Sequence, residues 1–132
     1  MTSDARITKA AVLQYTARGT QEETLPIIEA LIEAAADAGA EIICLPECAN
    51  FLAANKPSLK KLAETEANSR SLALLTSLAR RYQIIVSAGS LMMAADPDNP
   101  EDNRAANRSY LYTSNKLCKF YTTKYGFFND LR

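Results

Sequence analysis

Glu47 is the residue of this chain whose position is most typical of a catalytic group. It follows Pro46 at the end of a short apolar run, residues 41–45, which begins just after Gly39. Proline stops a strand, and ligands of parallel α/β sheets bind beyond the carboxyl ends of the strands. A carboxylate half-buried at such an edge holds a proton more readily than one in water and can act as a general base. On composition alone, however, a solvated glutamate at the end of a strand is favoured over a base, since most glutamates are solvated.

The chain contains three cysteines, Cys44, Cys48 and Cys118, and no histidine. An odd number without a regular framework does not indicate disulfides, and the C-x3-C pair has no histidine to complete a zinc site. Cys44 falls inside the apolar run, and Cys48 points away from Glu47 if the chain there is extended. We expect three reduced, structural thiols in a cytoplasmic protein.

Composition is typical of a globular protein of one domain. Of the 132 residues, 48% are apolar, which is enough for a hydrophobic core. The 15 basic and 15 acidic residues balance and the basic ones are scattered, so we expect no nucleic-acid or membrane partner. No signal peptide is evident, and no apolar run reaches transmembrane length.

The first third of the chain predicts a strand, a helix and a second strand. Residues 7–15 are mostly apolar and rich in strand formers, which indicates a buried strand. Thr20 and Glu23 have the spacing of a capping box at a helix start, and Gly39 is a natural stop for that helix. With residues 41–45 as the next strand, this segment is a βαβ unit.

The middle of the chain predicts a second helix and strand. A short helix over residues 58–66 precedes a longer one over residues 69–82. Residues 84–91 then form a third strand, with Gly89 inside it. Residues 94–106 are rich in Asp, Asn and Pro, which indicates an exposed loop.

The end of the chain predicts a hairpin. Residues 108–113 alternate as a half-buried strand does, and Ser114 and Asn115 form a turn into residues 116–121. The whole is one α/β domain. The four glycines are not clustered into a phosphate loop, which disfavours a nucleotide-binding module.

Four tracts, in this order along the chain, resemble the nitrilase superfamily of carbon–nitrogen hydrolases. They correspond to the family's opening strand, its first signature ending in Pro-Glu, its next helix and strand, and its Asn-Thr/Ser strand. Phe51 and Leu52, with the fourth tract, are most similar to the amidase-like branch. The tracts are residues 10–14 (AAVLQ), 35–47 (AADAGAEIICLPE), 78–79 (LA) with 84–90 (IIVSAGS), and 107–111 (NRSYL).

The resemblance implies an αββα sandwich of four layers and a Glu-Lys-Cys mechanism that needs no metal or organic cofactor. In the family the Glu activates a Cys thiol, which attacks a small linear amide or nitrile, and the Lys stabilises the tetrahedral intermediate. Glu47 matches the family Glu. The matching region covers about the first half of the family domain, so we expect residues 1–132 to be an N-terminal portion that lacks the nucleophilic Cys.

Lys124 matches the family Lys in one of two alignments. In the first, Tyr121 and a slip of one residue bring Lys124 and Phe128 into the family's Tyr-x-Lys tract. In the second, residues 123–132 resemble the strand and following tract around the nucleophile, with Phe128 at the place of the Cys. Lys124 is catalytic in the first alignment and a surface lysine in the second, and both remain open.

Half of a sandwich leaves an open sheet edge and an uncovered apolar face. We therefore expect the isolated chain to be inactive and poorly stable, or to self-associate as a homo-oligomer. The alternative to a hydrolase is a non-catalytic fragment that pairs with an intact homologue through this face.

Overall fold

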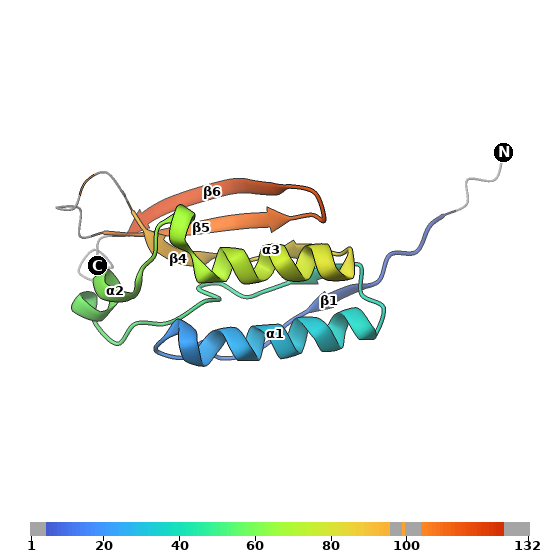
Figure 1. Cartoon of the computed structure of the whole chain (residues 1–132), viewed down its shortest axis with the longest axis horizontal. Coiled ribbons are helices and arrows are strands. Elements are labelled where there is room, and N and C mark those ends of the chain that lie inside the picture. Colours follow the sequence, from blue (N-terminus) through green and yellow to red (C-terminus); the bar gives the residue numbers. More distant parts are fainter. Residues whose placement is uncertain (1–4, 96–98, 100–103, 126–132) are drawn as a thin grey trace.

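The computed structural model describes residues 5–95, 99 and 104–125, with side chains up to residue 117. In this part of the chain, two long helices lie on one face of a six-stranded sheet (Figure 1). The helices are α1 (Gln21–Asp37), α2 (Lys56–Leu62), the 3-10 helix η1 (Glu66–Asn68) and α3 (Arg70–Tyr82). The strands are β1 (Ala10–Val12), β2 (Ile42–Cys44), β3 (Ile85–Ser87), β4 (Leu91–Ala94), β5 (Ala105–Tyr112) and β6 (Leu117–Tyr125).

The sheet combines a parallel and an antiparallel half. β1, β2 and β3 are parallel neighbours, with Ala11 beside Ile43 and Ile43 beside Val86. β5 runs antiparallel to β3, β4 and β6. The predicted α/β class, the βαβ unit and the terminal hairpin are confirmed. Parallel strands need a crossover between them, and α1 and α3 provide the two crossovers.

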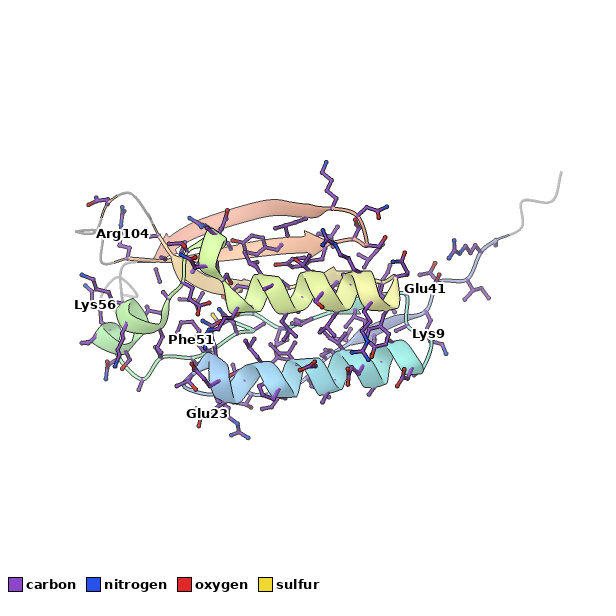
Figure 2. All side chains as sticks on the ribbon, viewed as in Figure 1. Lys9, Glu23, Glu41, Phe51, Lys56 and Arg104 are labelled. Atoms are coloured by element: carbon purple, nitrogen blue, oxygen red, sulfur yellow. The ribbon has the colours of Figure 1, made fainter. Side chains whose placement is uncertain are left out.

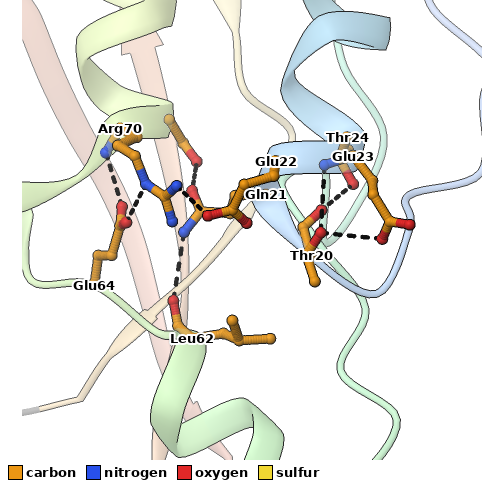
Figure 3. Close-up of polar contacts among 9 residues, drawn as sticks. Thr20, Gln21, Glu22, Glu23, Thr24, Leu62, Glu64 and Arg70 are labelled. Atoms are coloured by element: carbon orange, nitrogen blue, oxygen red, sulfur yellow. Dashed lines mark hydrogen bonds and ion pairs between the residues drawn. The ribbon is translucent and has the colours of Figure 1, made fainter.

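Local signals set both ends of α1. The Thr20 hydroxyl oxygen accepts from the Glu23 amide at 3.3 Å, and the hydroxyl donates to the Glu23 carboxylate at 3.0 Å (Figure 3). At the other end Gly39 has φ 89°, and its amide donates to the Ala36 carbonyl at 2.9 Å. Left-handed backbone costs glycine little, so the predicted stop is the observed one.

Polar side chains join the amino ends of α1 and α3. Arg70 lies between two carboxylates, with Nη1 2.5 Å from Glu22 and Nε 2.6 Å from Glu64 (Figure 3). The hydrogen bond to Arg70 lowers the pKa of Glu22. Exposed ion pairs contribute little, whereas a buried polar group must be paired. The stronger constraint is therefore the buried Gln21, which accepts a hydrogen bond from the Ser71 hydroxyl.

The hydrophobic core fills the space between the helices and one face of the sheet (Figure 2). On the opposite face Val12 is 75% exposed, and the paired residues Cys44, Ser87 and Leu111 are half-buried. The expectation of one covered and one open face thus matches the structure. The largest fully buried apolar side chains of the core are Ile28, Ile32, Ile43, Leu75, Leu78, Val86, Leu91, Met93, Tyr110 and Tyr112.

A charged network ties η1 to β5. Arg108 is 9% exposed; its Nη1 lies 3.2 Å from a Glu66 oxygen, and its Nη2 donates to the Ala95 carbonyl at 3.0 Å. The Tyr110 hydroxyl donates to the same Glu66 oxygen at 2.9 Å. Burial, followed by the bond to Glu66, raises the pKa of Tyr110. The charge-assisted hydrogen bonds that the nearly buried Arg108 guanidinium donates fix this part of β5.

Two predicted strands differ from those observed. The strand predicted over residues 7–15 is only Ala10–Val12, and it is an edge strand with an exposed Val12 rather than a buried one. The strand predicted over residues 84–91 is two strands, β3 and β4, separated by Gly89. The predicted loop over residues 94–106 lies partly outside the described residues, and β5 begins within it.

Gly89 breaks the strand because two carbonyl groups approach its Cα. Its φ is 62°, and a Cβ at this position would lie 2.3 Å from the carbonyl oxygens of both Leu45 and Pro46. A side chain at residue 89 would therefore collide with backbone atoms, which cannot move aside as the end of a flexible side chain can. Leu45 and Pro46, which follow β2, thus pack directly against the backbone at the break between β3 and β4.

We predict that Gly89→Ala destabilises the domain, because the new Cβ is both strained and blocked. The free energy of unfolding, measured by urea denaturation, should fall by about 2–4 kcal/mol. The matched control is Gly19→Ala, whose Cβ would meet nothing nearer than the Leu52 carbonyl oxygen at 4.0 Å. Equal losses for the two variants would contradict the close approach at residue 89.

Candidate active site

The turn after β2 carries Glu47 and is held by the segment between β3 and β4. The Ala49 amide donates to the Ser90 carbonyl at 2.8 Å, and the Ser90 amide donates to the Pro46 carbonyl at 3.4 Å. The turn lies at the carboxyl end of β2, which faces the end of the molecule that carries Phe51, whereas Glu41 marks the opposite end (Figure 2). The predicted position of Glu47 at the carboxyl edge of the sheet is therefore the observed one.

Cys48 adopts a left-handed backbone that turns the chain back onto β4. Its φ is 49°, and its amide donates to the Ser90 hydroxyl oxygen at 2.9 Å. The Cys48 Sγ lies 3.6 Å from the Met92 Sδ. Non-glycine residues adopt this conformation only where surrounding contacts hold them. The backbone at Cys48 is therefore not extended, and the condition under which its side chain would point away from Glu47 is not met.

Asn50 anchors the far side of the turn. It is 1% exposed; its Nδ2 donates to the Met92 carbonyl, and its Oδ1 accepts from the Met92 amide, both at 2.9 Å. The Asn50 side chain thereby makes the same two bonds to the Met92 backbone that an opposed residue of a neighbouring antiparallel strand would make. The Tyr15 hydroxyl adds a bond to the Ala49 carbonyl at 2.9 Å. Three segments thus converge on the residues that follow Glu47.

The Glu47 side chain is exposed, and one of its oxygens is held by β5. The Asn107 Nδ2 donates to the Glu47 Oε1 at 3.2 Å, across 60 residues of sequence. The carboxylate is thus not half-buried, and among the described side chains Asn107 is the one that donates a hydrogen bond to it. An exposed carboxylate with one oxygen held in this way can still take up a proton from a neighbouring group on its other oxygen.

Lys124, the other predicted catalytic residue, lies in β6. Its backbone pairs with Ala106, and that of Thr123 pairs with Asn107. The register therefore brings residues 123–124 to the part of β5 that contacts Glu47. The Lys124 side chain and the whole of Phe128 lie outside the described residues. The catalytic role of Lys124 stays a prediction.

Neither cysteine with a described side chain is arranged as a nucleophile. Cys44 is half-buried on the face opposite the helices, not in the core where it was expected. Burial and the adjacent Glu47 charge raise the pKa of the Cys48 thiol, while the Ser90 hydroxyl acts in the opposite sense. A raised pKa leaves less thiolate, which is the reactive form. Cys118 lies on the predicted hairpin strand, opposite Leu111, with its side chain outside the described residues.

Three side chains that support the site, those of Asn50, Ser90 and Asn107, were not predicted from the sequence. Asn107 is the one with a usable signal: asparagine is a poor strand former, yet it stands in a strand between Ala106 and Arg108. In the described segments no three His, Cys, Asp or Glu side chains group closely enough to hold a metal ion. Nor does any helix there have the length and apolar character needed to cross a membrane.

We predict that Glu47 controls the reactivity of the Cys48 thiol. Glu47→Gln removes a neighbouring negative charge, which should lower the Cys48 pKa and speed alkylation by iodoacetamide at pH 8 by roughly two- to tenfold. Ser90→Ala should slow it, because a hydroxyl that stabilises the thiolate is lost. Mass spectrometry of the Cys48 peptide measures the rate, with Cys44 as internal control. A rate unaffected by Glu47→Gln would contradict the charge effect.

Comparison with solved structures shows the same fold in proteins longer than this one. The NitFhit protein of C. elegans is 24% identical with a TM-score of 0.72, over 96% of this chain and 30% of that one. Nit3 of Saccharomyces cerevisiae, of the nitrilase superfamily, is 21% identical with a TM-score of 0.69, over 89% and 43%. An amidase from Nesterenkonia sp. is 21% identical with a TM-score of 0.66, over 90% and 44%.

The chain spans less than half the length of these structures. No curated protein sequence matches it. The pattern that defines the carbon–nitrogen hydrolase family matches residues 9–125, from the residue before β1 to the last residue of β6. This match includes the Glu47 turn, the glycine break that supports it and Asn107. The chain therefore belongs to the carbon–nitrogen hydrolase family.

Proposed function

We propose that this chain supplies the general base, Glu47, of a hydrolase that cleaves the carbon–nitrogen bond of a small linear amide. The observation that carries the proposal is the Glu47 carboxylate itself. It is exposed at the carboxyl edge of the parallel strands, on a turn held by β4 and with one oxygen bound by Asn107. Active sites of parallel sheets form at this edge.

In the proposed reaction Glu47 accepts the proton of a cysteine thiol. The thiolate attacks the amide carbon, and the tetrahedral intermediate that forms carries its negative charge on the former carbonyl oxygen. Lys124 stabilises that charge in the alignment that assigns it to the family Lys. The intermediate expels the amine, which takes a proton from Glu47, and leaves a thioester. Water, deprotonated by Glu47, then hydrolyses the thioester and releases the acid and the thiol.

We propose further that the nucleophile is supplied from outside residues 1–132. The contact of Cys48 with Met92 and its raised pKa argue against this thiol as the nucleophile. The share of the solved relatives that the chain covers, 30–44%, agrees with an N-terminal portion of a longer catalytic domain. On this proposal the isolated chain is inactive.

The substrate class is supported by one of the relatives. The amidase from Nesterenkonia sp. AN1 has been solved in complex with butyramide and with acrylamide added to its active-site cysteine. Both molecules are short linear amides. A site open to solvent at Glu47 is compatible with such ligands, and we propose the same class for this chain.

The open face of the sheet favours a second candidate function, assembly with an intact homologue or with a second copy. Val12 is 75% exposed, and the row Cys44, Ser87, Leu111 beside it carries no charge. Apolar surface of this kind marks interaction sites. A monodisperse dimer of the isolated chain in light scattering, lost in Val12→Lys, would favour assembly.

We predict that the folded chain alone hydrolyses none of a panel of short amides that includes butyramide. When it is co-expressed with the remaining, cysteine-bearing portion of a homologous amidase, turnover should appear. Glu47→Gln and Lys124→Ala should then lower kcat by roughly 10²–10⁴-fold, because a base and a charge stabiliser are lost.

Lys116→Ala, at an exposed lysine before β6, is the matched control and should leave kcat unchanged. Turnover by the isolated chain that disappears in Glu47→Gln would overturn the claim of a missing nucleophile. Cys48 and Cys118 would then be replaced in turn. Activity that survives Glu47→Gln would overturn the role of Glu47.

A further inference from the structure

We infer that Asn107 is a positioning residue that orients the Glu47 carboxylate. The inference rests on the proposed role of Glu47 as base. The contact is direct, with the Asn107 Nδ2 3.2 Å from the Glu47 Oε1. The two partners differ in environment, because Asn107 is 6% exposed in the sheet whereas Glu47 is exposed on a turn. A buried donor in the sheet thus binds an exposed acceptor on the turn.

The sheet holds Asn107 in place from three sides. It pairs with Met92 of β4 and with Thr123 of β6, so its backbone lies in the interior of the sheet. The next residue, Arg108, is anchored to Glu66 and to the Ala95 carbonyl. A group fixed by packing and by its neighbours' hydrogen bonds loses little further entropy when it orients a partner.

The hydrogen bonds of Asn107 are those of a functional rather than a structural asparagine. Asn50, which is structural, has both side-chain atoms paired with the Met92 backbone. Asn107 donates to Glu47, while its buried Oδ1 has no partner within the described part of the chain. An unpaired buried oxygen is costly, and a strand gains nothing from asparagine itself. What the amide provides here is a neutral donor aimed at a carboxylate.

This arrangement divides the two oxygens of Glu47 between two tasks. Oε1 is bound by Asn107, which fixes the direction of the carboxylate plane. No described side chain bonds to Oε2, and we assign to this oxygen the exchange of a proton with the reacting group. A base must be held within hydrogen-bonding reach of its proton, so freedom of the side chain lowers the rate without changing how substrate binds.

The test uses nuclear magnetic resonance and thermal unfolding of the 132-residue chain. The side-chain amide signals of Asn107 are assigned by their loss in Asn107→Ala. In Glu47→Ala their exchange with solvent should speed up by roughly tenfold or more, as expected when a hydrogen bond of ordinary strength is lost. Ser109→Ala, on the same face of β5 and half-buried, should leave these signals unchanged.

Exchanging the amide and the carboxylate between positions 107 and 47 shows whether a loss of Tm comes from their direct contact or from a general disturbance of β5. Asn107→Asp places two carboxylates together and should lower Tm by about 5 °C or more. The double variant Asn107→Asp with Glu47→Gln restores a donor–acceptor pair in reverse and should recover at least half of that loss. Additive losses in the double variant, or exchange unaffected by Glu47→Ala, would overturn the inference.

The complemented enzyme distinguishes this inference from the proposed function. There Asn107→Ala should lower kcat by roughly tenfold with KM within about twofold, because orientation and not binding is lost. If the exchange and Tm measurements show that Asn107 and Glu47 are coupled, but kcat does not depend on Glu47, only the proposed function is overturned. Dependence on Glu47 without coupling to Asn107 would overturn only the positioning role.

Discussion

The close approach of the Leu45 and Pro46 carbonyl oxygens to the Cα of Gly89 is the contact on which the site depends. It leaves no room for a side chain, so the strand that would run through residues 84–94 is divided into β3 and β4. The division frees the backbone and hydroxyl of Ser90 to bind Cys48 and Ala49. A turn that would otherwise be a surface loop is thereby attached to the sheet.

An exposed reactive group is supported here by buried polar ones. The side chains that hold the Glu47 turn, Asn50 and Asn107, are 1% and 6% exposed. Their hydrogen bonds gain strength from the low local dielectric, and their positions are set by strands rather than by loops. The carboxylate remains open to solvent, where a substrate and a nucleophile can reach it. Buried asparagines therefore hold the Glu47 turn without shielding the carboxylate from solvent.

The sheet has one completed face and one open face. On the helix side, side chains from α1, α3 and the strands form a closed core. On the other side, Val12, Cys44 and Leu111 present apolar surface that no helix of the described residues covers. The relatives of known structure are more than twice as long as this chain. A further layer on this face would bury these side chains and complete a second core.

The sequence alone determined the parts of this protein that depend on neighbours along the chain. The cap at Thr20, the stop at Gly39, the hairpin and the position of Glu47 behind Pro46 follow from contacts within a few residues, and they are predictable for that reason. Tertiary structure decided the rest. The break at Gly89 and the bond between Asn107 and Glu47 need groups from distant segments, the latter separated by 60 residues. No local pattern encodes such contacts, because they exist only once the sheet has brought the segments together.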